Sequence, residues 1–176
     1  MKTQTLTITL LVLILQGALV CKAQQESNVA AEKMEAFSKL QGKWSGTGWY
    51  QQGSQERHLV KQTEHIYSKL DGKILVVEGQ GRHPETKEIV FEAFAVLHFD
   101  EVQGRYIFNT YTRDKGHTAA LAKFEGDDLI WWFETPTGGT IKYTIDFTET
   151  TWIEDGHYSP DGEKWYPFFH MELKKL

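Results

Sequence analysis

The stretch from Ile89 to Phe99, which reads IVFEAFAVLHF, decides the fold. Alternate residues in it are apolar and share one face: Ile89, Phe91, Ala93, Ala95, Leu97 and Phe99. The other face carries the polar residues Glu92 and His98. Successive side chains of a β-strand point to opposite faces, so this period of two predicts a strand with one dry face and one wet face.

The same alternation continues along the chain from Gly42 onward. In residues 140–148, TIKYTIDFT, four apolar residues alternate with polar ones. Turn signals such as Asp71-Gly72 divide the chain into extended segments. The ten segments are 43–52, 57–69, 73–82, 88–100, 105–113, 117–125, 128–134, 140–148, 151–158 and 164–174. No interval between them is long enough for a crossover helix, so consecutive strands are expected to pair as antiparallel hairpins.

One short helix is expected before the strands. Ser27 or Asn28 can cap it, and apolar residues recur at helical spacing as far as Leu40. We therefore expect an all-β fold, a roughly ten-stranded antiparallel up-and-down barrel with one short N-terminal capping helix. A two-sheet sandwich is the alternative. Ten strands make a barrel wider than the size of about eight that side chains fill, which predicts an internal cavity.

The first residues have the layout of a secretory signal peptide. A basic start precedes an uncharged apolar run from Leu6 to Val20, and Ala23 offers a small residue for cleavage. We expect residues 1–23 to be removed, leaving 24–176 as the barrel domain of a secreted or periplasmic protein. Acylation of Cys21, which would make a lipoprotein, is the alternative. Cys21 is the chain's single cysteine, so cleavage after Ala23 excludes disulfides and thiolate sites.

The charge and the motif content exclude several classes of protein. The formal net charge is −5 and basic residues form no stripe, which argues against binding to nucleic acid or to an anionic membrane. After signal cleavage no apolar segment of membrane-span length remains. A Gly-x-Ser-x-Gly elbow, a P-loop and a His-Glu-x-x-His motif are all absent, so an enzyme is left open without being favoured. The pattern does not set the oligomeric state.

A resemblance to known barrels begins at the first strand. Residues 40–44, LQGKW, resemble the Gly-x-Trp start of the calycin superfamily, which includes the lipocalins and fatty-acid-binding proteins. In those barrels the Trp packs at the closed end beside the helix. The resemblance therefore implies a structural role for Gly42 and Trp44.

A second resemblance concerns a hairpin. The segment from Ile66 to Gly81, IYSKLDGKILVVEGQG, is similar to an exported bacterial family catalogued as a domain of unknown function. That family has a lipocalin-like barrel, which implies a structural role for Asp71 and Gly72 in the hairpin. The resemblance as a whole covers about Phe37 to Leu173.

A third resemblance makes haem the alternative ligand. Residues 42–48, GKWSGTG, resemble the opening of nitrobindin-type haem barrels, which have a proximal His near the C-terminus, where His170 lies. The chain departs from that motif at residues 49–51. Haem, or an enzymatic reaction using His170 in the same cavity, is therefore kept as an alternative. Otherwise we expect no cofactor and no metal.

The expected ligand is a small hydrophobic molecule inside the barrel. Apolar side chains would bury it, and Arg113 or His170 would orient it. The candidate binding residues are Phe91, Leu97, Phe99, Tyr111, Arg113, Trp132, Ile141, Tyr143, Phe147 and His170. A third interpretation is an interaction module, with a filled barrel and an outward aromatic patch at Trp131 or Trp132.

Strand carboxylates are a further candidate group: Glu64, Glu78, Glu92, Glu134 and Glu154. The default expectation is that they lie on the wet face. A pair that faced inward would suit acid–base work if burial raised one pKa. Nothing in the pattern pairs them.

Overall fold

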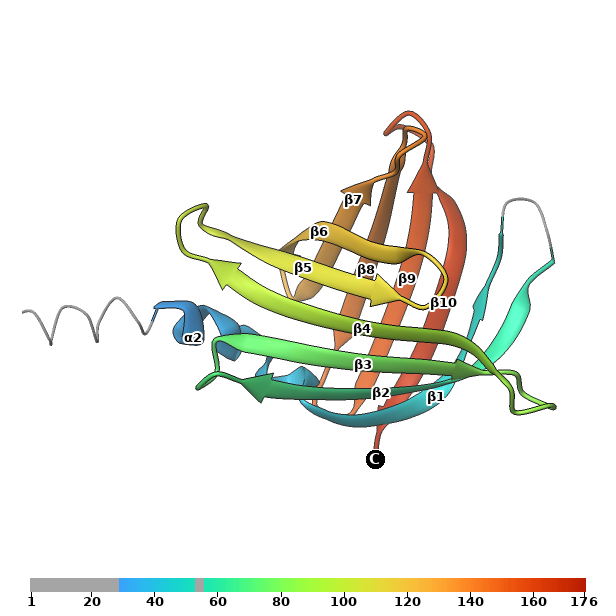
Figure 1. Cartoon of the computed structure of the whole chain (residues 1–176), viewed down its shortest axis with the longest axis horizontal. Coiled ribbons are helices and arrows are strands. Elements are labelled where there is room, and N and C mark those ends of the chain that lie inside the picture. The colour runs from blue at the N-terminus through green and yellow to red at the C-terminus, as the bar shows by residue number, and fades with distance from the viewer. Residues whose placement is uncertain (1–28, 53–55) are drawn as a thin grey trace, which may run out of the picture.

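Ten antiparallel strands close into a barrel in the computed structural model, which describes residues 29–52 and 56–176 (Figure 1). The strands are β1 (Gly42–Tyr50), β2 (His58–Lys69), β3 (Ile74–Arg82), β4 (Ile89–Asp100), β5 (Arg105–Thr112), β6 (Gly116–Glu125), β7 (Asp128–Glu134), β8 (Thr140–Phe147), β9 (Thr151–Ser159) and β10 (Tyr166–Lys175). The predicted fold class is confirmed. The predicted signal peptide, residues 1–23, lies outside the described residues.

The barrel has up-and-down topology. Each strand pairs with the next along the chain, and β1 also pairs with β10 to close the sheet. Closure depends on two glycines of β1. A Cβ atom at Gly46 would overlap the carbonyl oxygen of Glu172, and one at Gly48 would lie 2.5 Å from that of His170. Glycine therefore lets the first and last strands approach.

A short helical segment covers one end of the barrel. It consists of α2 (Val29–Met34) and the 3₁₀ helix η1 (Glu35–Leu40), so the expected helix is confirmed with a tighter second half. Phe37 is completely buried and packs edge-on against Tyr106, 5.1 Å away between ring centroids. Trp44 is also completely buried, and its indole Nε1 donates a hydrogen bond of 2.8 Å to the Leu40 carbonyl.

The hairpin between β2 and β3 needs unusual backbone angles. Leu70 and Asp71 have φ of 52° and 54°, and Gly72 has φ of 86°. Asp tolerates and Gly favours this left-handed region, which explains why this pair forms the turn.

The barrel interior is packed at the helix end and partly open at the other. Most aliphatic inward side chains next to the helix are buried, whereas the aromatic Phe99, Tyr106 and Phe124 there are partly buried; the buried ones are Ile66, Leu75, Leu97, Leu129, Ile145 and Leu173. Inward side chains toward the opposite end are only half-buried: Ala93, Thr110, Thr118, Phe133, Ile141 and Phe169. We call these two parts the packed half and the open half. Among the described residues, no helix has the length and apolarity required to cross a membrane.

Candidate functional site

Two carboxyl groups face the barrel interior where the packed half ends. Glu64 of β2 shares its face with the buried Ile66, and Glu154 of β9 shares its face with the buried Trp152. Their exposed fractions are 7% and 6%. The default expectation of a wet-face carboxylate is therefore wrong for these two. It is confirmed for the exposed Glu78, Glu92 and Glu134.

Each buried carboxyl receives one hydrogen bond from a side chain. The Gln62 amide donates to Glu64 Oε1 at 2.7 Å, and the Trp131 indole donates to Glu154 Oε1 at 3.1 Å. Gly79 of β3 makes room for the first of them, because a Cβ there would lie 2.7 Å from both oxygens of Glu64. The carboxyls are held, but their surroundings are largely apolar.

Burial keeps this pair at least partly protonated near neutral pH. It raises the pKa of Glu64 to about 7, although the Gln62 hydrogen bond acts in the opposite direction. Burial also raises the pKa of Glu154 to about 8, opposed by the Trp131 hydrogen bond and reinforced by the charge of Glu64. The two groups interact, so the charge of one changes the pKa of the other and their titrations are coupled. A neutral carboxyl both donates and accepts hydrogen bonds, whereas an ionised one only accepts.

Aromatic rings form a wall beside Glu154. Trp131 lies flat against Tyr143, with 3.9 Å between ring centroids and 5° between planes. Phe108 meets Trp131 edge-on at 4.9 Å, and Phe169 meets Tyr143 edge-on at 5.7 Å. Burial and the nearby Glu154 raise the pKa of the Tyr143 hydroxyl. This wall continues into the open half, because Tyr143 and Phe169 remain partly exposed.

One polar atom near the pair is unpaired. Trp152 is only 4% exposed, and its indole Nε1 has no hydrogen-bond partner among the described residues. Its ring packs edge-on against Trp44, 5.9 Å away. The indole nevertheless interacts with Glu154 as a weak hydrogen-bond donor, which lowers the pKa of that carboxyl.

Six of the ten residues expected to bind ligand share the inward face of their strands. Leu97 belongs to the core of the packed half, and Phe99 and Phe147 are partly buried against that core. Phe91, Ile141 and Tyr143 lie toward the open half, where Phe91 is 38% exposed. Their role in binding stays a prediction. The other four, Tyr111, Arg113, Trp132 and His170, do not face the interior.

His170 lies on the outer surface. Its ring stacks on Trp49, an outward residue that follows the inward Gly48. Its two ring nitrogens form hydrogen bonds with the carboxylates of Asp155, at 2.8 Å, and Glu172, at 3.2 Å. Partial burial lowers its pKa, but the hydrogen bonds to the two carboxylates outweigh this and raise it. The haem alternative required an inward His170, and this orientation does not supply that ligand.

Tyr111 and Trp132 point outward because their neighbours on the same strands point inward. Trp131 fills the interior, so Trp132 faces solvent, where Lys123 lies over its ring at 5.4 Å. Phe108 faces inward, so Tyr111, three positions later, faces out and contacts the His117 ring at 4.8 Å. Each strand can send only alternate residues into the barrel.

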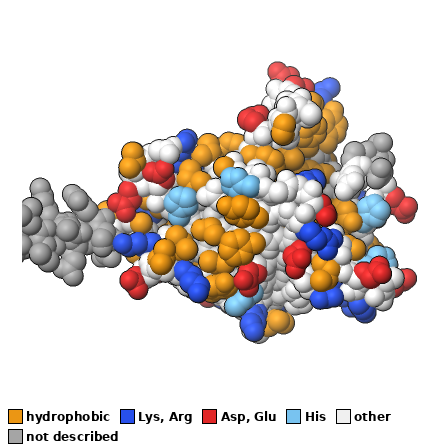
Figure 2. Space-filling view, viewed as in Figure 1, with side chains coloured by type: hydrophobic (Ala, Val, Ile, Leu, Met, Phe, Trp, Pro, Cys, Tyr) orange, Lys and Arg blue, Asp and Glu red, His pale blue; other side chains and the backbone are white. Residues whose placement is uncertain are grey.

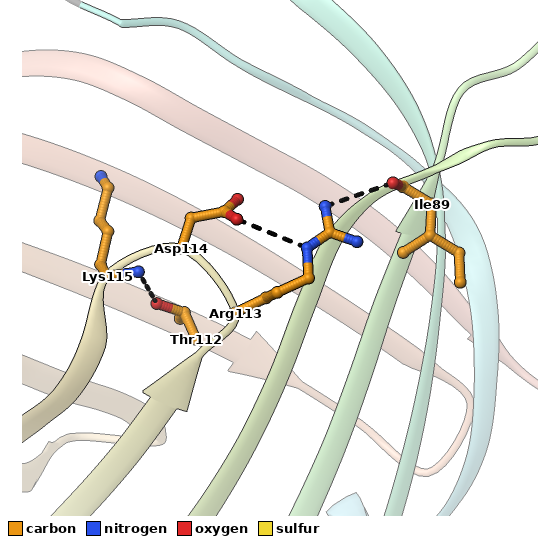
Figure 3. A network of polar contacts seen from close by, with 5 residues as sticks. All are labelled: Ile89, Thr112, Arg113, Asp114 and Lys115. Carbon is orange, nitrogen blue, oxygen red and sulfur yellow. Dashed lines mark hydrogen bonds and ion pairs between the residues drawn. The ribbon is translucent and has the colours of Figure 1, made fainter.

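Arg113 lies at the rim just after β5 (Figure 3). Its guanidinium is 3.4 Å from the Asp114 carboxylate and donates to the Ile89 carbonyl at 3.4 Å. Together with outward side chains such as Phe94 and Tyr111, it lines a surface groove of about 620 Å³ across β3, β4 and β5. Figure 2 looks onto this outer face, where hydrophobic side chains gather with acidic and basic ones beside them.

Sequence reasoning missed the residues at the centre of the site: Gln62, Glu64, Trp131 and Glu154. A usable signal existed for Glu64, because it has the same phase in β2 as the apolar Val60 and Ile66. Because glutamate is polar, it was expected on the wet face despite its position in the alternation.

Comparison with known proteins supports the fold. No family model matches the chain. The structure is similar to the crystal structure of Rv2717c from M. tuberculosis, with a TM-score of 0.63 and 11% identity over 81% of this chain and 96% of that one. It is also similar to the S-type phycobiliprotein lyase CPES from Guillardia theta, with a TM-score of 0.57 and 11% identity over 86% and 95%. At this identity the likeness concerns the barrel fold alone.

Proposed function

We propose that the protein is exported and binds a small, largely apolar molecule in the open half of its barrel. The observation that carries the proposal is the graded burial of the inward side chains. Most aliphatic side chains beside the helix, such as Leu97, are buried, whereas at the other end even the aliphatic Ile141 is only partly buried. Apolar surface that faces inward and stays accessible is typical of ligand sites in barrels.

The chemistry of the wall suits such a ligand. Burial of apolar surface contributes about 25 cal/mol per Å² removed from water, and the Trp131–Tyr143 stack offers a flat face for it. The carboxyls of Glu64 and Glu154 lie at the bottom of the open half and would orient a polar group. Likeness to a barrel named as a phycobiliprotein lyase also supports a small-molecule role. Export is supported by the apolar run from Leu6 to Val20.

Native mass spectrometry of the protein purified gently from an exporting host tests the proposal first. We expect an added mass that organic solvent releases, together with an N-terminus at Gln24. A protein that begins at Met1 inside the cell would contradict export. The released compound identifies the ligand directly.

A matched pair of variants on β6 tests where the ligand lies. Thr118 faces the open half and is half-buried, whereas the adjacent Ala119 is exposed on the outer face. We expect Thr118→Trp to occupy the open half and to weaken binding of the released ligand by roughly tenfold or more. Ala119→Trp should leave binding unchanged. Equal affinities in both variants would place the ligand elsewhere and overturn the proposal.

A further inference from the structure

The two carboxyl groups at the bottom of the open half have no basic partner among the described residues. Glu64 and Glu154 interact with each other, but among the described residues no basic side chain forms an ion pair with either carboxyl or contributes to its pKa. Among the described residues, the ammonium group of Lys175 is engaged at the closed end. It donates to the Lys39 carbonyl at 3.0 Å and lies over the Trp44 ring. The two acids therefore lack a counter-ion.

The unpaired indole of Trp152 is a second and independent sign. It is a donor, so it needs an acceptor. The nearest candidate acceptor is Glu154, which already accepts from Trp131 and gains full acceptor capacity only when ionised. An ionised Glu154 would accept more strongly from both indoles than the neutral carboxyl does, because a hydrogen bond to a charged acceptor is stronger. Ionisation in this apolar setting requires a cation, and the described residues do not bring one.

We propose that the ligand carries a basic nitrogen, which enters the open half as a cation and lies between the Glu64 and Glu154 carboxylates. This rests on the proposed function, since it specifies the chemical class of the same ligand. The apolar part of the molecule packs on the Trp131–Tyr143 wall. An anionic ligand is disfavoured, because it would add a third negative group beside two uncompensated acids.

Binding of such a ligand is coupled to protons. Near neutral pH Glu154 is largely and Glu64 partly protonated, so a cation that binds must displace protons into solvent. The other ionisable groups near the pair are the Tyr143 hydroxyl, whose raised pKa keeps it neutral, and Asp155, which faces outward beside His170. Affinity for the amine should therefore rise with pH through the range in which Glu64 and Glu154 lose their protons.

Three ten-carbon probes that differ only in the head group test this: decylamine, decanol and decanoate. Binding to the mature protein is measured by calorimetry. At about pH 8 we expect decylamine to bind roughly tenfold more tightly than decanol, and decanoate to bind most weakly. At about pH 5.5 the preference for the amine should shrink toward none. Near pH 7, comparison of two buffers with different ionisation enthalpies should show proton release for decylamine and none for decanol.

Matched variants locate the effect. Glu154→Gln keeps the shape and neutral character of the buried group, so we expect it to fold, to bind decanol normally and to lose most of the amine preference. Glu92→Gln removes a carboxylate from the outer groove and should change neither affinity. Loss of the preference in Glu92→Gln alone would place the amine on the outer face and overturn the inference.

The failures of the two proposals are distinguishable. Equal binding of amine and alcohol, with no proton release, would contradict the basic head group and leave an apolar ligand in the open half. Absence of binding for all three probes would contradict both. The calorimetric proton count uses the unaltered protein, so the test does not depend on the folding of any variant.

Discussion

Trp131 and Trp132 are neighbours in the chain, yet their side chains lie on opposite faces of the sheet. Trp131 is 9% exposed, stacks on Tyr143 and donates to Glu154, whereas Trp132 lies outside under Lys123. A single position in the alternation separates a ring that satisfies a buried acid from one that covers the surface. The polar interior is thus maintained by individual hydrogen bonds.

Replacing each Trp with Phe separates these roles. Trp131→Phe removes the donor to Glu154 while keeping most of the aromatic packing, so we expect a loss of about 1–3 kcal/mol in the free energy of unfolding. Trp132→Phe should change it by about 0.5 kcal/mol or less. Urea denaturation measures both. Equal losses would mean that the indole N–H of Trp131 does not contribute to stability.

The buried acids also make stability depend on pH. The pKa values of Glu64 and Glu154 in the folded protein lie above the ordinary value of 4.5, so the folded state binds more protons than the unfolded chain between about pH 4.5 and 8. The stabilisation contributed by these two acids is fully present below this range and is lost as pH rises through it. For Glu154 the decrease amounts to roughly 4 kcal/mol.

Denaturation at several pH values, compared between variants, measures this decrease. Glu154→Gln should give a flatter curve, with stability retained at about pH 8. The exposed Glu92→Gln serves as the control and should follow the unaltered protein. The raised pKa of His170 acts in the same direction in every variant, so it cancels in the comparison. Parallel curves for Glu154→Gln and the unaltered protein would contradict a buried neutral acid.

At the scale of elements, β1 holds the barrel together because it pairs with both β2 and β10. Its glycines allow the approach to β10, where a Cβ at Gly46 would meet the backbone of Glu172. Backbone atoms of a strand cannot move aside as a flexible side chain can. The seam between the first and last strands is therefore the element most sensitive to added volume.

Gly46→Ala tests this seam. We expect a loss of about 2–3 kcal/mol or more in unfolding free energy, with faster hydrogen exchange in the amides of β10. Thr47→Ala, at the adjacent exposed position, should lose about 0.5 kcal/mol. Unchanged exchange in β10 for Gly46→Ala would contradict a role of this glycine in closure.

The whole molecule is a closed sheet with one packed end and one open end. Closure leaves no unpaired edge strand, and the helical segment seals the packed half through residues such as Phe37. Every strand contributes to the same core. A closed barrel of this kind is expected to unfold as one cooperative unit.

Removal of the sealing ring tests cooperativity. Phe37→Ala should reduce stability by about 3–5 kcal/mol, because the ring is completely buried. Tryptophan fluorescence and far-ultraviolet circular dichroism should still report coincident transitions. The exposed Lys39→Ala should have little effect. Separate transitions in Phe37→Ala would show that the helix end and the strands unfold independently.

The sequence by itself determined the architecture. The period of two, the turn signals and the absence of crossover helices predicted ten antiparallel strands, and all ten are present. The Asp71-Gly72 turn and the buried Trp44 were also predictable, because each depends on local backbone chemistry or on a short motif. Alternation within one strand is a local property, so it can be read without knowledge of the rest of the chain.

Only the tertiary structure decided which side chains meet inside. Glu64 and Glu154 belong to distant strands, and barrel closure makes them interact. The orientation of His170 was ambiguous, because in plain alternation it shares a face with the apolar Phe168 as well as the polar Glu172, and an irregularity between Pro167 and Phe169 shifts the alternation. Inward and outward are properties of the closed sheet, since register and closure select the face that becomes the interior. The candidate site therefore emerges from pairing across the barrel, which no single segment encodes.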